Sequence, residues 1–290
     1  MGMRTRVLAT TAAVLVIAAA PASAATRTET STSGQVTANF TYDYQKTQFG
    51  SYDFSNLHVT IDRGGTRLVD QGVADVCDAC EGWPADMGSK ETQSVTARDL
   101  DADDEPEVLV DLFSGGANCC WYTISYRYDE TLNKYVTKVL RPGLSFPYTL
   151  KDIDHNGIPE FRSVDYRFAY KYGSNADTPR PLRIFNWDAG KLVDVTVAFP
   201  RLAAQDAADM YKGYLQYRKV KDVNVRGLLA AYLADSYRAG NGRVAWRRVV
   251  AAYRRGDVDK KFEGDVGPHG KAYLTSLRRF LNKLGYLRSK

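Results

Sequence analysis

Two short acidic segments carry the side chains with the clearest chemistry in this chain of 290 residues: DLDADDEPE at 99–107 and DIDHNGIPE at 152–160. Each places an oxygen-bearing side chain at its first, third, fifth and ninth positions and ends in Pro-Glu. Calcium takes about six to eight oxygen ligands, and a tight loop with carboxylates on alternate residues supplies them. The predicted calcium ligands are Asp99, Asp101, Asp103, the backbone carbonyl of Glu105, Glu107, Asp152, Asp154, Asn156, the backbone carbonyl of Ile158, and Glu160.

The two loops belong to an internal repeat, because residues 95–108 align without gaps on residues 148–161 at an offset of 53. Gly157 stands where the second loop must turn sharply, and Asp104 takes that place in the first. An EF-hand needs a carboxylate at position twelve of its loop, where this chain has Val110 and Ser163, so EF-hand geometry is not expected. The alternative is a pair of solvated acidic turns. Repulsion among six carboxylates within nine residues of the first loop favours a bound cation.

The hydrophobic pattern changes at Pro200. Before it, apolar and polar residues alternate, as in QVTANFTYDY at 35–44, which predicts strands. After it, apolar stripes at helical spacing, such as Leu274, Leu277 and Leu281, predict three or four helices. A repeat of about 50 residues in a β region is typical of blade-like units. We therefore expect an α+β protein, with an antiparallel β domain of propeller-type repeats at 35–200 and a helical domain at 201–290.

The pattern D-x-D-x-[DN]-[GD]-x-P-E between two strands resembles the calcium-binding repeat of the FG-GAP/VCBS type, found in secreted bacterial proteins. The resemblance covers about residues 95–197. It implies calcium in loops that connect strands, β-blade architecture, and no known catalysis. Two loops are fewer than the four to eight or so blades of a complete propeller, and Asp104 replaces the usual glycine in the first loop.

The N-terminal residues have the pattern of a secretory signal peptide. Arg4 and Arg6 precede an apolar stretch at 7–20, and an A-x-A pattern ends at Ala24, so cleavage is expected there. The Thr/Ser-rich segment 25–34 is predicted to be a disordered lead-in. We expect a secreted, extracellular protein with no membrane span after signal removal.

Charge divides the chain at the same place as the hydrophobic pattern. Residues 25–200 have a formal net charge of −9, whereas residues 201–290 have +12. The basic helical domain is expected to bind an anionic cell-wall polymer or polysaccharide, which an extracellular protein meets more readily than nucleic acid. The alternative is that its basic face is solvated, or packs against the acidic β domain.

The cysteines are Cys77, Cys80, Cys119 and Cys120. In an exported chain an even number favours disulfides. A bond between the adjacent Cys119 and Cys120 would close a strained ring, so either of the two cross-pairings is expected. A zinc site and a redox CxxC are the alternatives, but adjacent cysteines fit a tetrahedron poorly, and CxxC redox pairs usually stand beside a helix.

An aromatic segment, DYRFAYKY at 165–172, suggests a ligand platform. In a strand, Tyr166, Phe168, Tyr170 and Tyr172 would share one face. Exposed, they would form a stacking surface for sugars; buried, they would belong to the sheet core.

Catalytic motifs are missing from the sequence. His58, His155 and His269 stand in unrelated contexts, and no GxSxG, HExxH or phosphate-binding glycine loop is present. We therefore expect a calcium-stabilised protein that binds or scaffolds at or near the cell surface. The alternative is a secreted carbohydrate-active hydrolase that uses surface carboxylates.

Overall fold

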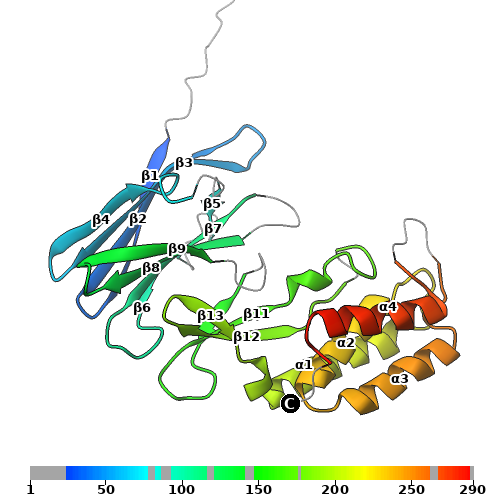
Figure 1. Cartoon of the computed structure of the whole chain (residues 1–290). Coiled ribbons are helices and arrows are strands. Elements are labelled where there is room, and N and C mark those ends of the chain that lie inside the picture. The colour runs from blue at the N-terminus through cyan, green and yellow to red at the C-terminus, as the bar shows by residue number, and fades with distance from the viewer. Residues whose placement is uncertain are drawn as a thin grey trace, which may run out of the picture.

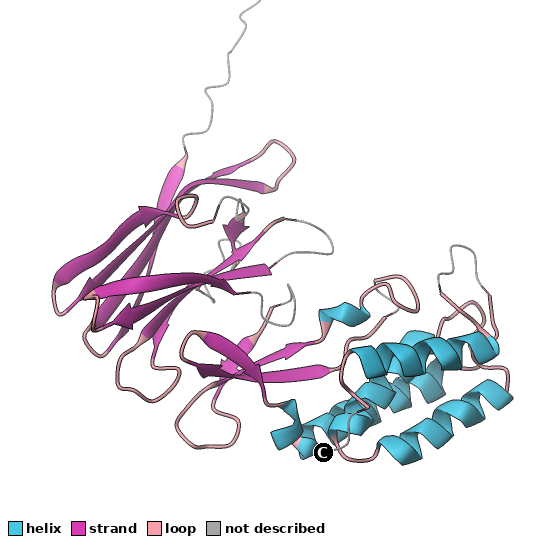
Figure 2. Ribbon diagram, in the orientation of Figure 1, coloured by secondary structure: helices cyan, strands magenta, loops and turns pink. Residues whose placement is uncertain are grey.

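The computed structural model describes residues 24–77, 82–85, 93–115, 121–140, 147–175, 178–261 and 267–287. These residues form three antiparallel sheets followed by four α-helices. Two sheets stack at one end of the molecule, the third lies in the middle, and the helices occupy the other end (Figures 1 and 2). The α+β class with a C-terminal helical segment is therefore as predicted.

The first two sheets form a sandwich. Strand β2 shows why: its alternating apolar residues Val36, Ala38, Phe40 and Tyr42 are all fully buried on one face. They pack against inward-facing residues of the second sheet, including Val110. The first sheet contains β1 (Ala25–Ser33), β2 (Val36–Lys46), β3 (Tyr52–Arg63) and β4 (Thr66–Gly72); the second contains β5 (Trp83–Pro84), β6 (Val95–Arg98), β7 (Glu107–Phe113), β8 (Trp121–Asp129) and β9 (Lys134–Leu140).

Strand β1 corrects the prediction of a disordered lead-in at 25–34. It pairs along its whole length with β2. Threonine favours strands, and Thr28 and Thr30 form cross-strand hydrogen bonds with Thr41 and Asn39. Glu29 is buried and accepts hydrogen bonds from the Tyr42 hydroxyl and the Ser94 backbone amide, which ties the two sheets together. Composition alone concealed this buried partner.

The third sheet is smaller and packs against the sandwich. A separate apolar core joins Leu100 and Leu109 of the sandwich to Phe161, Phe185 and Trp187 of this sheet. Its strands are β10 (Thr149–Lys151), β11 (Glu160–Val164), β12 (Leu182–Asp188) and β13 (Lys191–Asp194).

The helical segment has a core of its own and is fastened to the third sheet. Pro200 occupies the first turn of α1, where its missing N–H costs nothing. The backbone amide of Leu182 donates to Asp235 at 3.0 Å, and the Tyr286 hydroxyl donates to buried Asp165 at 2.8 Å. The helices are α1 (Pro200–Tyr217), α2 (Arg226–Arg238), α3 (Gly242–Arg254) and α4 (Gly270–Lys283).

The predicted propeller is wrong for the described part of the chain, which shows no closed propeller and no repeated blade. The two acidic hairpins of the internal repeat lie in sheets of different size and surroundings. The hairpin β6–β7 belongs to the five-stranded sheet of the sandwich, whereas β10–β11 belongs to the four-stranded sheet beside the helices. A short repeated hairpin therefore does not imply a repeated blade.

Candidate metal centres

The two acidic loops have the same local structure. The first joins β6 to β7 and the second joins β10 to β11. Three hydrogen bonds recur at an offset of 53: from residues 100 and 153 to the final glutamate, from 104 and 157 to the first aspartate, and from 105 and 158 to the side chain at the fifth position. Positive φ recurs as well, at Ala102 and His155 and at Asp104 and Gly157. The repeat seen in the sequence is thus a repeat of backbone geometry.

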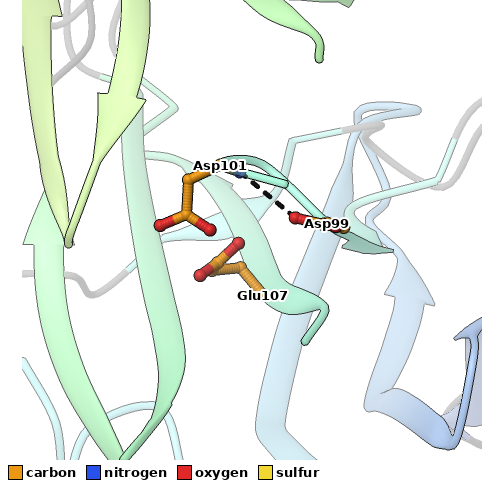
Figure 3. Close-up of side chains that lie close together, drawn as sticks. All are labelled: Asp99, Asp101 and Glu107. Carbon is orange, nitrogen blue, oxygen red and sulfur yellow. Dashed lines mark hydrogen bonds between the residues drawn. The ribbon is translucent and has the colours of Figure 1, made fainter. Parts of the chain in front are cut away.

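Three carboxylates converge inside each loop. Asp99, Asp101 and Glu107 offer oxygens that all lie within 4.8 Å of one another, and so do Asp152, Asp154 and Glu160. Figure 3 shows the Asp101 and Glu107 carboxylates facing each other beside Asp99. Oxygens that share a calcium ion at about 2.4 Å lie at most about 4.8 Å apart. The spacing in both loops therefore fits one such ion.

Burial makes these carboxylates poorly satisfied by the protein alone. Glu160 is fully buried and Glu107 is 1% exposed. Burial, together with nearby Asp101, raises the pKa of Glu107 to about 8, and burial also raises the pKa of Glu160. No hydrogen-bond donor among the described residues reaches Glu160 Oε1 or Asp101 Oδ1. A cation in each loop would offset this desolvation.

The remaining predicted ligands have local roles in the structure. Asp103 Oδ1 accepts the Glu105 amide at 3.0 Å, and Asn156 Oδ1 accepts the Ile158 amide at 2.8 Å, so both side chains brace their loops. Cation coordination by these two side chains, and by the carbonyls of Glu105 and Ile158, stays a prediction. The Glu105 side chain turns toward the first sheet and forms a two-pronged ion pair with Arg63, at 2.8 and 3.0 Å.

One basic neighbour of the first loop escaped the sequence reasoning. The Arg127 guanidinium on β8 donates to Asp103 at 3.1 Å, and its Nε lies 3.6 Å from Glu107 Oε1 and 3.9 Å from Asp101 Oδ2. Its proximity depends on strand pairing between β7 and β8, which no local motif reports.

The cysteine prediction falls largely outside the described residues. Cys77 is disulfide-bonded. Cys80, Cys119 and Cys120 are not among the residues that the structure describes. The pairing of the four cysteines therefore stays a prediction.

Of the two interpretations of the aromatic segment 165–172, the structure favours burial over an exposed platform. Residues 166–168 form a short 3-10 helix instead of a strand, capped by the Asp165 carboxylate, which accepts the Arg167 amide. Phe168 and Tyr172 are fully buried in the core of the helical segment, whereas Tyr170 is 49% exposed. Alternation with polar residues mimicked a strand, but long-range packing of Phe168 on Phe280, at 4.9 Å between ring centroids, decides the conformation.

A different row of aromatic side chains lies at the surface of the sandwich. Successive ring centroids are 4.9 to 6.4 Å apart, and each residue is partly exposed. Phe49, on the neighbouring β2–β3 turn, is 88% exposed. Because these rings come from five strands, no contiguous segment of the sequence indicates them. The row consists of Tyr44, Tyr52, Phe54, Trp83, Phe113 and Trp121.

The histidines and paired carboxyls do not assemble an evident catalytic centre among the described residues. His58 pairs with Asp70 at 2.7 Å on the surface, whereas the His269 ring near α4 donates from Nδ1 to the Lys260 carbonyl at 3.0 Å and accepts from the Arg226 guanidinium. Burial raises the pKa of Asp235 well above its usual value, and the side-chain hydrogen bond with Asp206 raises it further. Glycosidase carboxyls stand farther apart, at about 5 to 9.5 Å, so this pair does not have their geometry.

None of the helices among the described residues is long and apolar enough to cross a membrane.

Comparison with known proteins relates this chain to a small set of proteins. Residues 203–285 match the family described as the sll0997 C-terminal domain. The chain is 26% identical over 204 residues to the probable thylakoid lumen protein sll0997 of Synechocystis, covering 66% of this chain and 60% of that protein. It is 29% identical over 207 residues to the uncharacterized protein y4bJ of Sinorhizobium fredii, covering 63% of this chain and 30% of that protein. No solved structure matches.

These comparisons overturn the predicted membership of the FG-GAP/VCBS repeat proteins. The matching family and the relatives are of a different kind, and the match to the family lies in the helical segment. The acidic pattern itself spans only nine residues per loop, too few to identify a family. The chain also spans less than two thirds of the length of either relative.

Proposed function

We propose that this chain is an exported protein, stabilised by calcium in its two acidic loops, that binds or scaffolds on the lumenal or extracellular side of a membrane. The observation that carries the proposal is the pair of carboxylate clusters, each closed by a buried glutamate. In an acidic turn whose carboxylates are solvated by water alone, the carboxylates stay exposed, because charged side chains are rarely buried without a partner. These loops bury a glutamate among further carboxylates, at equivalent positions in two hairpins.

The donor set favours calcium over other common cations. Each cluster consists of carboxylate oxygens, with backbone carbonyl oxygens in the same loop and, in the second loop, the amide oxygen of Asn156. Zinc prefers histidine nitrogen and cysteine sulfur. Magnesium demands near-ideal octahedral geometry and keeps several waters, whereas calcium accepts irregular sets of oxygens. Calcium is therefore the ion to test first, with magnesium as the comparison.

A structural role follows from where the loops lie. Glu107 and Glu160 are the first residues of β7 and β11, and both strands contribute apolar residues to the core between the second and third sheets. A cation held by each glutamate and the preceding aspartates would fasten the start of a core strand to its hairpin. Neither cluster includes a histidine, and all three carboxylates of each cluster would be ligands of the ion, so a structural ion fits better than a catalytic one.

Export and surface binding rest on separate observations. The relative named a probable thylakoid lumen protein supports translocation across a membrane. On the helices, several arginine and lysine side chains are exposed, which supports binding of an anionic polymer such as a cell-wall polysaccharide. They are Arg247, Arg254, Arg278, Arg279 and Lys283.

Calcium titration of the purified chain tests the central proposal. Isothermal titration calorimetry is expected to show two bound ions, and the thermal midpoint is expected to rise with calcium and fall with a chelator. The paired variant D99N/D152N, which removes the first aspartate of each loop, is expected to lose both effects. Equal midpoints for the wild-type chain in millimolar calcium and in chelator would refute a calcium-stabilised fold.

Sedimentation with an anionic polysaccharide tests the surface role. Binding is expected at low salt and should weaken as salt is raised. The variant R278E/R279E is expected to bind less, whereas the charge-neutral control S276A on the same helix should bind normally. Binding that is unchanged in R278E/R279E would exclude this face of α4 as the polymer site.

A further inference from the structure

The two loops have the same backbone conformation, but their final glutamates lie opposite different residues on the neighbouring strand. Strand β7 pairs with β8 so that Val108 lies opposite Tyr126, which places Glu107 opposite Arg127. Strand β11 pairs with β12 so that Phe161 lies opposite Phe185, which places Glu160 opposite Asn186. The position across from the buried glutamate is therefore a cation in the first loop and a neutral amide in the second.

Arg127 already contacts the first cluster. Its Nη2 donates to Asp103 Oδ2 at 3.1 Å, and its Nε lies 3.6 Å from Glu107 Oε1 and 3.9 Å from Asp101 Oδ2. Yet the buried Nε forms no hydrogen bond with any described residue. The guanidinium thus supplies positive charge to two members of the cluster without satisfying them fully.

At the second cluster the corresponding residue, Asn186, is neutral and supplies no positive charge. Its Oδ1 is buried and has no hydrogen-bond donor among the described residues. Glu160 Oε1, which the register places across from it, is unpartnered as well. No arginine or lysine in the described part of the chain forms an ion pair with Asp152, Asp154 or Glu160. Two buried oxygens that lack donors are the environment in which a cation gains most.

We infer that the residue opposite the buried glutamate sets the calcium affinity of each loop, so that the second loop binds calcium more tightly than the first. This inference rests on the proposed function. In the first loop the ion must share Asp101 and Glu107 with the positive charge of Arg127, and it binds only when the guanidinium is repelled or displaced. The Arg127 side chain is 36% exposed, so it can turn toward solvent when the ion enters.

The asymmetry gives the two loops different tasks. The second loop holds its ion even at low calcium concentration, so this ion stabilises the β10–β11 hairpin under all conditions. The first loop fills only at higher concentration, and filling releases Arg127 from Asp103. Through the Glu105–Arg63 ion pair the first loop also contacts the first sheet.

Reciprocal exchange of the two opposing residues tests the inference. Each loop is measured alone by calorimetry with calcium, after D154N silences the second loop or D101N silences the first. Replacing Arg127 by Asn is expected to raise the affinity of the first loop at least about tenfold, because a repelling unit charge at this distance is removed. Replacing Asn186 by Arg is expected to lower the affinity of the second loop by a similar factor. R127K, which keeps the charge, is the matched control and should bind like the wild-type chain.

The outcomes separate this inference from the proposed function. If neither loop binds calcium in any variant, the proposed function fails. If both loops bind but R127N leaves the first loop unchanged, or the wild-type loops have equal affinities, the inference alone fails. If N186R does not fold, the R127N and R127K pair still decides the question, because that pair removes or keeps a charge that is partly exposed.

Discussion

Replacing Glu160 by Gln should change the stability of the protein in opposite directions with and without calcium. Glu160 is fully buried, its Oε2 accepts the Ile153 amide at 2.7 Å, and its Oε1 has no donor among the described residues. Glutamine keeps the size of the side chain and an oxygen for Ile153, but removes the buried charge. In chelator the variant should therefore be at least as stable as the wild-type chain, because burial raises the pKa of Glu160 and so disfavours its charged form.

In calcium the same variant should be less stable. An ion present at 100 times its Kd contributes about 2.7 kcal/mol to the free energy of unfolding. If losing the charged ligand weakens binding about 100-fold, that contribution falls to about 0.4 kcal/mol. E160Q should therefore cost about 2 kcal/mol in calcium, which is large compared with the error of a urea titration. The second loop is the better place for this measurement because Arg127 does not contact it.

Urea unfolding in chelator and in saturating calcium measures both signs. E130Q is the matched control, since Glu130 is exposed in the turn between β8 and β9, and it should have no effect in either condition. A glutamate that serves only as a buried hydrogen-bond acceptor would give the same change in both conditions. Equal effects of E160Q with and without calcium would therefore refute the reasoning.

Three further predictions concern other parts of the fold. Burial raises the pKa of Asp111 to about 6 from 3.8 in spite of hydrogen bonds from Thr123 and Tyr148. Because the folded-state pKa is raised, the contribution of Asp111 to stability is largest below about pH 4 and is lost as pH rises through 6. In urea titrations in saturating calcium, the wild-type chain should therefore lose about 2 to 3 kcal/mol relative to D111N over this window; equal pH profiles of the two chains would contradict this assignment. Y286F removes the hydroxyl that donates to buried Asp165 and should cost about 1.5 to 3 kcal/mol of unfolding free energy, whereas Y170F at an exposed ring should cost nothing. G157A should lower stability by about 1 kcal/mol in calorimetric melting, because the φ of +92° there disfavours a side chain although space is open around it.

Sequence reasoning reached the local geometry where one contiguous segment holds all the information, whereas calcium binding by these loops stays a prediction. The acidic loops are such segments, since spacing alone places Asp99, Asp101 and Glu107 around one point when the chain turns between two strands. The change of period at Pro200 is another, because helical and extended segments bury apolar residues at different spacings. In the structure α1 begins at Pro200, one residue before the expected start of the helical domain at 201.

Sequence reasoning failed where a distant partner decides the structure. The Thr-rich segment 25–33 lacks large apolar residues, yet β2 and the buried Glu29 hold it in a sheet. The alternation at 166–172 predicted a strand, but Phe280 and the helical core hold Phe168 in a short helix. Arg127 and Asn186 became visible only when strand register placed them opposite the two glutamates. Register is a long-range property that local patterns do not report.

Arg127 also bears on how the fold survives without calcium. The first loop lies where three sheets meet: Leu100 is buried in the core between the second and third sheets, and Glu105 pairs with Arg63 of the first. Unneutralised carboxylates at such a junction would repel one another, and the guanidinium reduces this repulsion when no ion is bound. R127Q should therefore be less stable than the wild-type chain in chelator and should regain its stability in saturating calcium, as urea unfolding would measure. R127K should behave like the wild-type chain in both conditions. A deficit of R127Q that calcium fails to repair would mean that the arginine serves only as a packing residue of β8, and that the first loop does not exchange one cation for another.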